Sequence, residues 1–165
     1  MTRIIVSDTG PLLHLSEAGA VDLLSQAGEV LIPAVVAVEF EANAQGWSPP
    51  QWARIIELEK PARQKADKWV RAEQVDRGEA EAIALALQEQ ADWLLTDDAQ
   101  ARQFAEANGL EVHGSIGVLL WSIVSGNVHA RETAHQLLDN LAGSTLWISK
   151  QVLREAQKAI DALFE

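Results

Sequence analysis

Apolar positions along this chain form short runs separated by longer stretches with helical spacing. The runs at 3–7, 29–33 and 92–96 have the length and the apolar content of buried strands. Two weaker runs, at 53–58 and 110–114, are expected to form further strands. Strands that alternate with helices in this way predict an α/β domain with a mostly parallel central sheet of about five strands.

Helical patterns occupy the segments between these runs. Pro11 and Pro33 suit the first turn of a helix, where a missing N–H costs nothing, and Asn108-Gly109 is a typical helix end. The segment "GWSPP" at 46–50 predicts a loop. The expected helices cover residues 11–24, 33–44, 63–74, 77–90, 99–109 and 115–126.

The last forty residues carry no chemical signature. Two amphipathic helices are expected near 130–141 and 149–163. We therefore divide the chain into a domain core at 1–126 and C-terminal helices at 127–165. These helices are expected to pack on the same domain or at a dimer or partner interface.

Composition narrows the class of protein. The chain has 165 residues, of which 48% are hydrophobic, enough for one domain with a substantial core. No segment approaches about 18 consecutive apolar residues, and the N-terminus lacks the pattern of a signal peptide. Cysteine is absent, which excludes disulfides and thiolate metal sites. We expect a soluble, cytoplasmic protein.

The charge is strongly negative and unevenly placed. A formal net charge of −11 argues against a passive nucleic-acid coat, which would be basic overall. Most of the positive charge nevertheless lies in one stretch, where seven Lys and Arg residues at 54–77 alternate with acids. A solvated helix with ion pairs is the simplest interpretation of that stretch.

Acidic residues follow the predicted strands. Asp8 ends the first strand, Asp97 and Asp98 follow the fourth, and Glu39 and Glu79 lie on the helices between. In an open parallel sheet, ligands bind beyond the carboxyl ends of the strands, so these acids are candidates for one site. Each acid also has a purely structural explanation, as a helix cap or as a complement to a helix dipole.

Such a group of carboxylates favours a divalent cation. Like charges in proximity raise one another's pKa, and a bound cation removes that conflict. Oxygen ligands favour Mg²⁺ or Mn²⁺ over Zn²⁺. A hard ion in an acidic site suits the hydrolysis of phosphodiester bonds.

Five segments together resemble the PIN-domain family: "VSDTGPLLHL", "IPAVVAVEF", "DRGEAEAIALAL", "LLTDDAQAR" and "GSIGVLLWSIVSG". More narrowly, the chain resembles uncharacterised prokaryotic PIN-domain nucleases related to VapC-like toxins. The resemblance implies a Rossmann-like, three-layer α/β/α fold. It also implies an endoribonuclease that depends on Mg²⁺ or Mn²⁺, in some members the toxin of a type II toxin–antitoxin pair.

The resemblance also assigns roles to individual residues. It implies that Asp8, Glu39, Glu79 and Asp98 are the catalytic acids, and that Asp8, Glu79 and Asp98 bind the metal. Thr9 occupies the hydroxyl position beside the first acid and is assigned to substrate binding.

Three assignments stay open at this level. Glu81 is an alternative to Glu79, and Asp97 is an alternative metal ligand to Asp98. Arg102, one helical turn after Asp98, either contacts a substrate phosphate or pairs with the local acids.

Partners and aromatic residues complete the expectations. The resemblance implies single-stranded RNA as substrate, a homodimer and an antitoxin partner. No association with a membrane is expected. The alternative is a catalytically inactive PIN-like module that binds RNA or protein. His14 is expected to pack among leucines, Trp47 and Trp52 are candidates for stacking a base, and Trp147 is assigned to the core or an interface.

Overall fold

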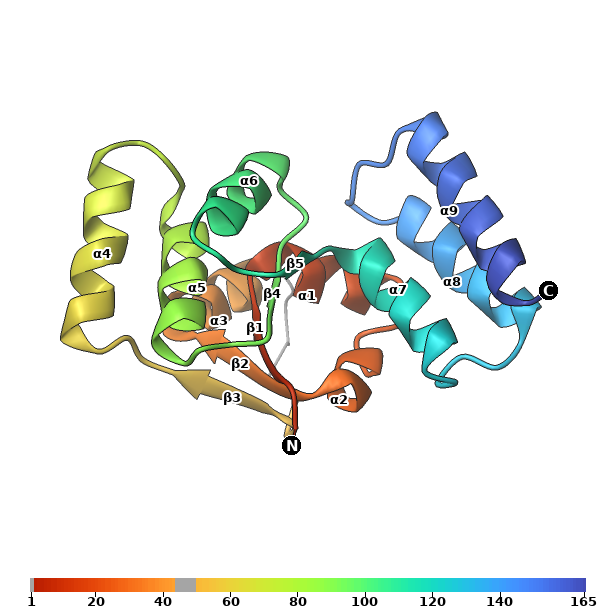
Figure 1. Cartoon of the computed structure of the whole chain (residues 1–165), viewed down its shortest axis with the longest axis horizontal. Helices are drawn as coiled ribbons and strands as arrows, with labels where there is room; N and C mark the ends of the chain where they lie inside the picture. Colours follow the sequence, from red (N-terminus) through yellow and green to blue (C-terminus); the bar gives the residue numbers. More distant parts are fainter. Residues whose placement is uncertain (1, 44–49) are drawn as a thin grey trace.

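A computed structural model describes residues 2–43 and 50–165, and in this part of the chain five strands form one parallel sheet. The strand order is β3-β2-β1-β4-β5, so the first strand lies at the centre (Figure 1). The predicted α/β class with a parallel sheet is confirmed. The strands are β1 Ile4–Ser7, β2 Glu29–Pro33, β3 Ala53–Ile56, β4 Trp93–Leu95 and β5 Val112–His113.

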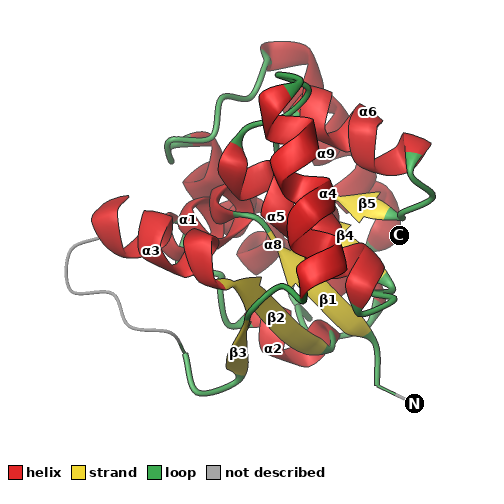
Figure 2. Cartoon of the chain, turned by 90° about the vertical axis from the view of Figure 1, so that its left-hand side faces the viewer, coloured by secondary structure: helices red, strands yellow, loops and turns green. Residues whose placement is uncertain are grey.

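Helices cover both faces of the sheet and give the molecule three layers (Figure 2). On one face, α5 and α6 pack against the sheet and α4 packs on α5. On the other face, the hydrophobic core includes α1, α2, α3, α7, α8 and α9. The helices in the described residues are α1 Thr9–Glu17, α2 Leu23–Ala27, α3 Ala34–Asn43, α4 Lys60–Arg71, α5 Arg77–Gln88, α6 Ala99–Ala107, α7 Ser115–Val124, α8 Arg131–Ala142 and α9 Lys150–Leu163.

The central strand shows why its sequence is almost continuously apolar. Successive side chains of a strand point to opposite faces, so Ile5 enters one hydrophobic cluster and Val6 the other. Both side chains are fully buried. A strand covered on both faces has no solvent side, which explains the unbroken run "IIV".

The C-terminal helices share a core with the rest of the chain. Leu138 and Leu141 of α8 and Ile160 of α9 are fully buried in the same cluster as Ile5 of the central strand. These helices contact α1 and α7, so the segment 127–165 packs directly on the sheet domain.

The single helix predicted over 11–24 is wrong. The structure has two helices there, α1 and α2, because Gly19 adopts a left-handed conformation with φ of 73°. The N–H of Ala20 donates to the carbonyl of Leu15 at 2.8 Å, which closes the end of α1. The apolar spacing continues across this break and hides it from a periodicity argument.

Two further predictions concern the loop and the membrane. The "GWSPP" segment, with Trp47, lies outside the described residues except for Pro50. Across residues 2–43 and 50–165, no helix combines the length and the apolar character needed to cross a bilayer.

Candidate active site

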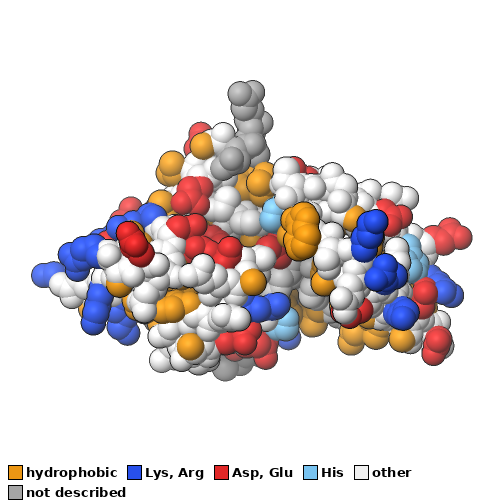
Figure 3. Space-filling view, turned by 90° about the horizontal axis from the view of Figure 1, so that it is seen from above, with side chains coloured by type: hydrophobic (Ala, Val, Ile, Leu, Met, Phe, Trp, Pro, Cys, Tyr) orange, Lys and Arg blue, Asp and Glu red, His pale blue; other side chains and the backbone are white. Residues whose placement is uncertain are grey.

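A pocket of about 510 Å³ opens beyond the carboxyl ends of β1 and β4. The structure brings all four predicted acids to its walls: Asp8, Glu39, Glu79 and Asp98. In the view from above, acidic side chains gather near the middle of this face, with basic side chains to the left, on the side of α4 (Figure 3). Segments far apart in the sequence therefore supply one acidic site.

Asp8 is the most deeply placed of the four acids, with only 8% of its surface exposed. It is the N-cap of α1, and its Oδ1 accepts a hydrogen bond from the N–H of Thr9 at 2.8 Å. Its Oδ2 accepts from the hydroxyl of Thr96 at 3.2 Å. Burial raises the pKa of Asp8 to about 6, although these two hydrogen bonds lower it. Repulsion from the negative charges of Asp76 and Glu39 adds to the increase.

Glu39 is held at the junction of three elements. The hydroxyl of Thr9, at the start of α1, donates to its Oε2 at 2.6 Å. A Cβ added to Gly78, at the start of α5, would lie 2.6 Å from the same oxygen. The glycine at the start of α5 therefore leaves the space that the Glu39 carboxylate occupies.

Glu79 lies in the first turn of α5 and closes a capping box. The N–H of Glu79 donates to the Asp76 carboxylate at 2.8 Å, and the N–H of Asp76 donates to the Glu79 carboxylate at 3.0 Å. Burial raises the pKa of Glu79 to about 8, and the negative charges of Asp76 and Asp98 contribute. Asp76 also lines the pocket and was absent from the predicted site. Its signal was the spacing Asp-x-x-Glu at 76–79, which is a capping-box pattern.

Asp97 and Asp98 have different surroundings, although both line the pocket. Asp97 accepts three hydrogen bonds: from the N–H of Ser115 at 2.7 Å, from the Ser115 hydroxyl at 2.6 Å and from Nδ1 of His14 at 2.6 Å. Burial opposes ionisation of Asp97, but these bonds prevail and lower its pKa.

Asp98, by contrast, is exposed and uses one oxygen to cap α6, where the N–H of Ala101 donates at 2.8 Å. Its charge acts on Glu79 across the pocket. Of the two neighbours, Asp98 is therefore the better placed to bind a ligand, and Asp97 ties α1 to α7.

Glu81 points away from the pocket. Its buried carboxylate lies 3.8 Å from a guanidinium nitrogen of Arg77 and 4.0 Å from one of Arg63, between α4 and α5. Burial raises the pKa of Glu81, and the two arginines partly oppose that shift. This geometry favours Glu79 over Glu81 as the third acid of the pocket.

Arg102 interacts with groups other than the carboxylate of Asp98. Its guanidinium donates to the carbonyl of Val112 at 3.1 Å and lies 3.4 Å from the carboxylate of Glu106. The side chain is still 45% exposed and lines a second pocket that adjoins the acidic one.

Three residues in or next to the acidic pocket were missed or assigned otherwise from the sequence: Thr96, which lines the adjoining pocket, His14 and Trp147. Thr96 donates to Asp8 and accepts from the N–H of Asp98 at 3.3 Å, so one buried hydroxyl links two of the acids. His14 is largely buried as expected, but it lines the pocket and bonds to Asp97. Trp147 lies in the loop between α8 and α9 and is 84% exposed, so the expectation of a core position is wrong, and an interface position stays a prediction. A polar residue after a strand, as in "LLTDD", was the available signal for Thr96.

The carboxylates of the pocket are ligands of the type that a hard divalent cation prefers, and they line one common space. Carboxylates from four segments line one pocket, and the pKa values of Asp8 and Glu79 are raised partly by neighbouring negative charges, which a cation would offset. Within residues 2–43 and 50–165, however, no three His, Asp or Glu side chains already stand in an arrangement that could hold one ion. Metal binding would therefore require the carboxylates to move closer together.

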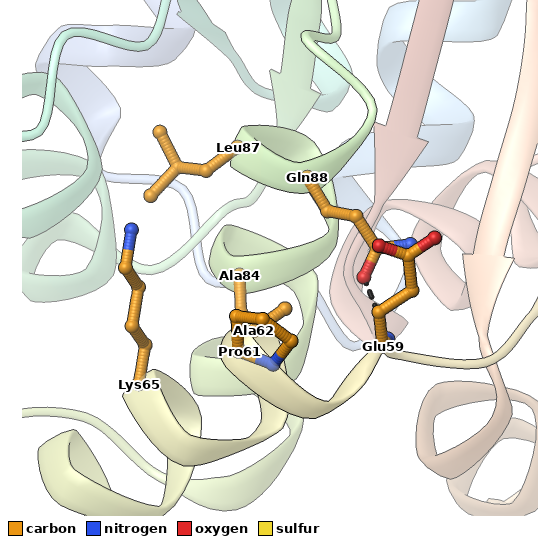
Figure 4. Close-up of a pocket in the computed structure, with 7 residues that line it drawn as sticks. All are labelled: Glu59, Pro61, Ala62, Lys65, Ala84, Leu87 and Gln88. Atoms are coloured by element: carbon orange, nitrogen blue, oxygen red, sulfur yellow. Dashed lines mark hydrogen bonds between the residues drawn. The ribbon is translucent and has the colours of Figure 1, made fainter.

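A smaller hollow of about 190 Å³ lies between α4 and the second half of α5 (Figure 4). The N–H of Glu59 donates to the side-chain carbonyl of Gln88 at 2.7 Å, and Lys65 stands at the other side. Apolar residues form much of its remaining wall, and none of the pocket acids reaches it. This hollow belongs to the packing of two helices, and the acidic pocket remains the candidate active site.

The fold and the pocket together define a three-layer α/β protein with a carboxylate cluster at the carboxyl edge of its parallel sheet. A family model described as PIN domain (DUF3368) matches residues 4–162. The chain therefore belongs to the PIN-domain family, as the resemblance predicted. PIN domains are generally nucleases and typically use divalent metals. No curated protein matches the chain.

Proposed function

We propose that this protein is an endoribonuclease that hydrolyses RNA phosphodiester bonds with the help of Mg²⁺ or Mn²⁺. The observation that carries the proposal is the meeting of Asp8, Glu39, Glu79 and Asp98 in one pocket. A buried carboxylate whose pKa is raised to about 6 is costly to keep in a fold, and such groups occur most often where chemistry needs them.

Within this proposal, Asp8, Glu79 and Asp98 would hold the metal ion. When bound, the ion would activate water and stabilise negative charge on a phosphate. The chain itself orients the acids: Thr9 and Thr96 fix the two oxygens of Asp8, and the hydroxyl of Thr9 fixes Glu39. These bonds hold two carboxylates in defined positions before any substrate arrives.

The charge distribution supports an anionic substrate despite the net charge of −11. Helix α4 packs on α5, whose first turn carries Glu79. The end of α4 lies beside the start of α5, where Arg77 donates to Asp67 at 2.6 Å. The exposed Lys68 and Arg71 are therefore at the end of α4 nearer the acidic pocket. These basic side chains would supply phosphate contacts, on which RNA affinity largely depends (Figure 3). Lys60 and Lys65 lie toward the other end of α5, where Glu59 bonds to Gln88.

A cleavage assay tests the proposal directly. End-labelled single-stranded RNA is incubated with the protein in Mn²⁺ or Mg²⁺, and we expect fragments that disappear in EDTA. Asp8→Asn keeps the helix cap, because asparagine also caps helices, and should reduce cleavage at least a hundredfold. Asp139→Asn is the matched control, since Asp139 is exposed on α8 and lies outside the acidic pocket.

The inactive-module alternative gives a different result in the same assay. If RNA stays bound in Mn²⁺ without fragments, or if Asp8→Asn cleaves as well as the wild type, the nuclease proposal fails. The role as a toxin, the antitoxin partner, the homodimer and the cytoplasmic location are finer parts of the proposal. Growth arrest on expression of the wild type, and normal growth with Asp8→Asn, would support the toxin role.

A further inference from the structure

A second pocket adjoins the acidic one and shares a wall with it. It has a volume of about 520 Å³ and lies between the starts of α6, α7 and α9. The shared wall includes Asp98 and the loop residues Leu146 and Trp147. Anything bound in the acidic pocket therefore has direct access to this neighbouring space.

Trp147 is the unusual feature of this wall. A tryptophan with 84% of its surface exposed leaves a large apolar area in water, which is unfavourable in a free molecule. It is the most exposed large hydrophobic side chain among residues 2–43 and 50–165. Its position at the boundary of two pockets makes its ring available to a ligand that occupies either of them.

Contacts of neighbouring residues hold the loop that carries Trp147. The hydroxyl of Thr145 donates to the carboxylate of Glu17 in α1 at 2.5 Å, and the N–H of Leu146 donates to the hydroxyl of Ser144 at 3.1 Å. Beyond the tryptophan, Ser149 caps α9 by accepting from the N–H of Val152 at 3.1 Å. The loop is anchored on both sides of an exposed ring, which reduces the entropy lost when the ring binds a ligand.

The chemistry of the second pocket suits a flat, partly polar ring. Ile116, Ile148 and Val152 contribute apolar surface next to Trp147. Gln103 adds a side-chain amide, and Arg102 adds a guanidinium that is 45% exposed. A nucleobase has an apolar face that stacks on tryptophan and polar edges that accept from amide and guanidinium donors.

We propose that this pocket, with Trp147 as its stacking platform, binds the base of a nucleotide next to the phosphodiester bond held in the acidic pocket. The proposal deepens the proposed function and rests on it for the source of the base. It makes Trp147 a substrate-positioning residue, whereas the sequence had suggested a stacking role for Trp47, which lies outside the described residues, and for Trp52. Of those two, Trp52 packs against the core.

Fluorescence quenching tests this site without cleavage or metal. Adenosine is titrated into the protein in EDTA, with ribose as the base-free control. We expect saturable quenching by adenosine, no quenching by ribose, and loss of the adenosine effect in Trp147→Phe. Trp69→Phe is the matched control, because Trp69 packs against Phe104 away from both pockets, and it should keep the quenching.

Steady-state kinetics supply the second arm. Trp147→Ala should raise KM for single-stranded RNA roughly tenfold and leave kcat within about twofold, since base stacking on an aromatic ring contributes on the order of 1–3 kcal/mol. Asp8→Asn should instead abolish kcat.

The outcomes separate the two proposals. Quenching that depends on Trp147, without any RNA cleavage, keeps the base site and overturns the nuclease. Cleavage without such quenching, and with an unchanged KM in Trp147→Ala, overturns the base site alone. If sedimentation shows that Trp147→Ala converts a dimer into a monomer, the pocket is an interface between copies of the chain and the base site is wrong.

Discussion

At the scale of single residues, the candidate site depends on how each carboxylate is satisfied. Asp8 is buried with two hydrogen bonds and has a raised pKa, whereas Asp97 is partly buried with three hydrogen bonds and has a lowered pKa. The difference follows from the donors, because Asp97 faces His14 and Ser115, whereas Asp8 faces other acids. Asp8 is therefore costly to the apo fold, and Asp97 stabilises it.

Asp8→Asn is expected to stabilise the metal-free protein at pH 7. The pKa of Asp8 rises from 3.8 to about 6 on folding, so the folded state binds more protons than the unfolded state between these values. Wild-type stability should therefore fall as the pH rises from about 4 to 6, and remain lower above that range. The asparagine variant avoids this cost, which is roughly 2–3 kcal/mol.

Urea unfolding in EDTA at pH 4 and pH 7 measures this effect. The advantage of Asp8→Asn should appear at pH 7 and vanish near pH 4, and Asp139→Asn should behave like the wild type. A variant that is less stable than the wild type at pH 7 would show that the Asp8 charge is compensated within the fold.

Asp97→Asn is expected to destabilise the protein near neutral pH by about 1–3 kcal/mol. The variant weakens the charge-assisted bonds from His14 and Ser115. Because the folded pKa of Asp97 is lowered, its contribution in the wild type is complete above the unfolded pKa and is lost as the pH falls through the folded one.

Asp98→Asn provides the comparison for Asp97→Asn. It makes the same change one residue away and retains an N-cap for α6. We expect Asp98→Asn to reduce RNA cleavage with little change in the free energy of unfolding. Equal losses of stability in the two variants would contradict the separate roles that the structure indicates.

At the scale of elements, the start of α5 links secondary structure to the site. Its first turn places Glu79 in the pocket, and Gly78 leaves room for Glu39 from α3. Glycine is a poor helix former, so its position in this first turn is better explained by the carboxylate beside it than by helix propensity.

Gly78→Ala is expected to keep the fold and impair the site. A Cβ 2.6 Å from the Glu39 carboxylate would force that flexible side chain to move, while alanine favours the helix by up to about 1 kcal/mol. RNA cleavage should fall at least tenfold, with the melting temperature within a few degrees of the wild type. Gly143→Ala is the control, because its added Cβ would meet only ordinary contacts, the nearest at 3.5 Å. Full activity in Gly78→Ala would remove Glu39 from the proposed machinery.

At the scale of the whole molecule, the C-terminal helices are part of the structure that presents the site. Leu138 and Ile160 are fully buried in the core that contains Ile5 of the central strand. The loop between α8 and α9 also carries Trp147 to the rim of the acidic pocket. The segment 127–165 therefore contributes both to packing and to the proposed substrate contacts.

A chain ending at residue 126 is expected not to fold cooperatively. Removing α8 and α9 would expose the apolar faces of α1 and α7 that these helices cover. Circular dichroism during heating should show no sharp transition for residues 1–126 and one for the full chain. A sharp transition near the melting temperature of the full chain would make the C-terminal helices dispensable for folding.

Much of this architecture could be predicted from the local pattern. Runs such as "IIV" and "EVLIP" identified strands of a parallel sheet, and the acids that follow or lie between them identified the edge where a site would form. The break at Gly19 was not predicted, because apolar spacing continues through it. The exposure of Trp147 was not predicted either: the residue falls between the helices expected near 130–141 and 149–163, but a local pattern does not show how much of a loop side chain the fold covers.

The sequence by itself determined the α/β class, the order of the strands along the chain and four of the acids that line the pocket at the carboxyl edge of the sheet. Only the tertiary structure showed that Glu79, and not Glu81, lines the acidic pocket, and that Asp97 bonds to His14 and Ser115 whereas Asp98 is exposed. It also placed the exposed ring of Trp147 beside that pocket. The physical reason is the direction in which each side chain points. Residues one or two positions apart point in different directions from a helix or an extended segment, and the packing of α1, α4, α7 and α9 selects which direction meets the pocket.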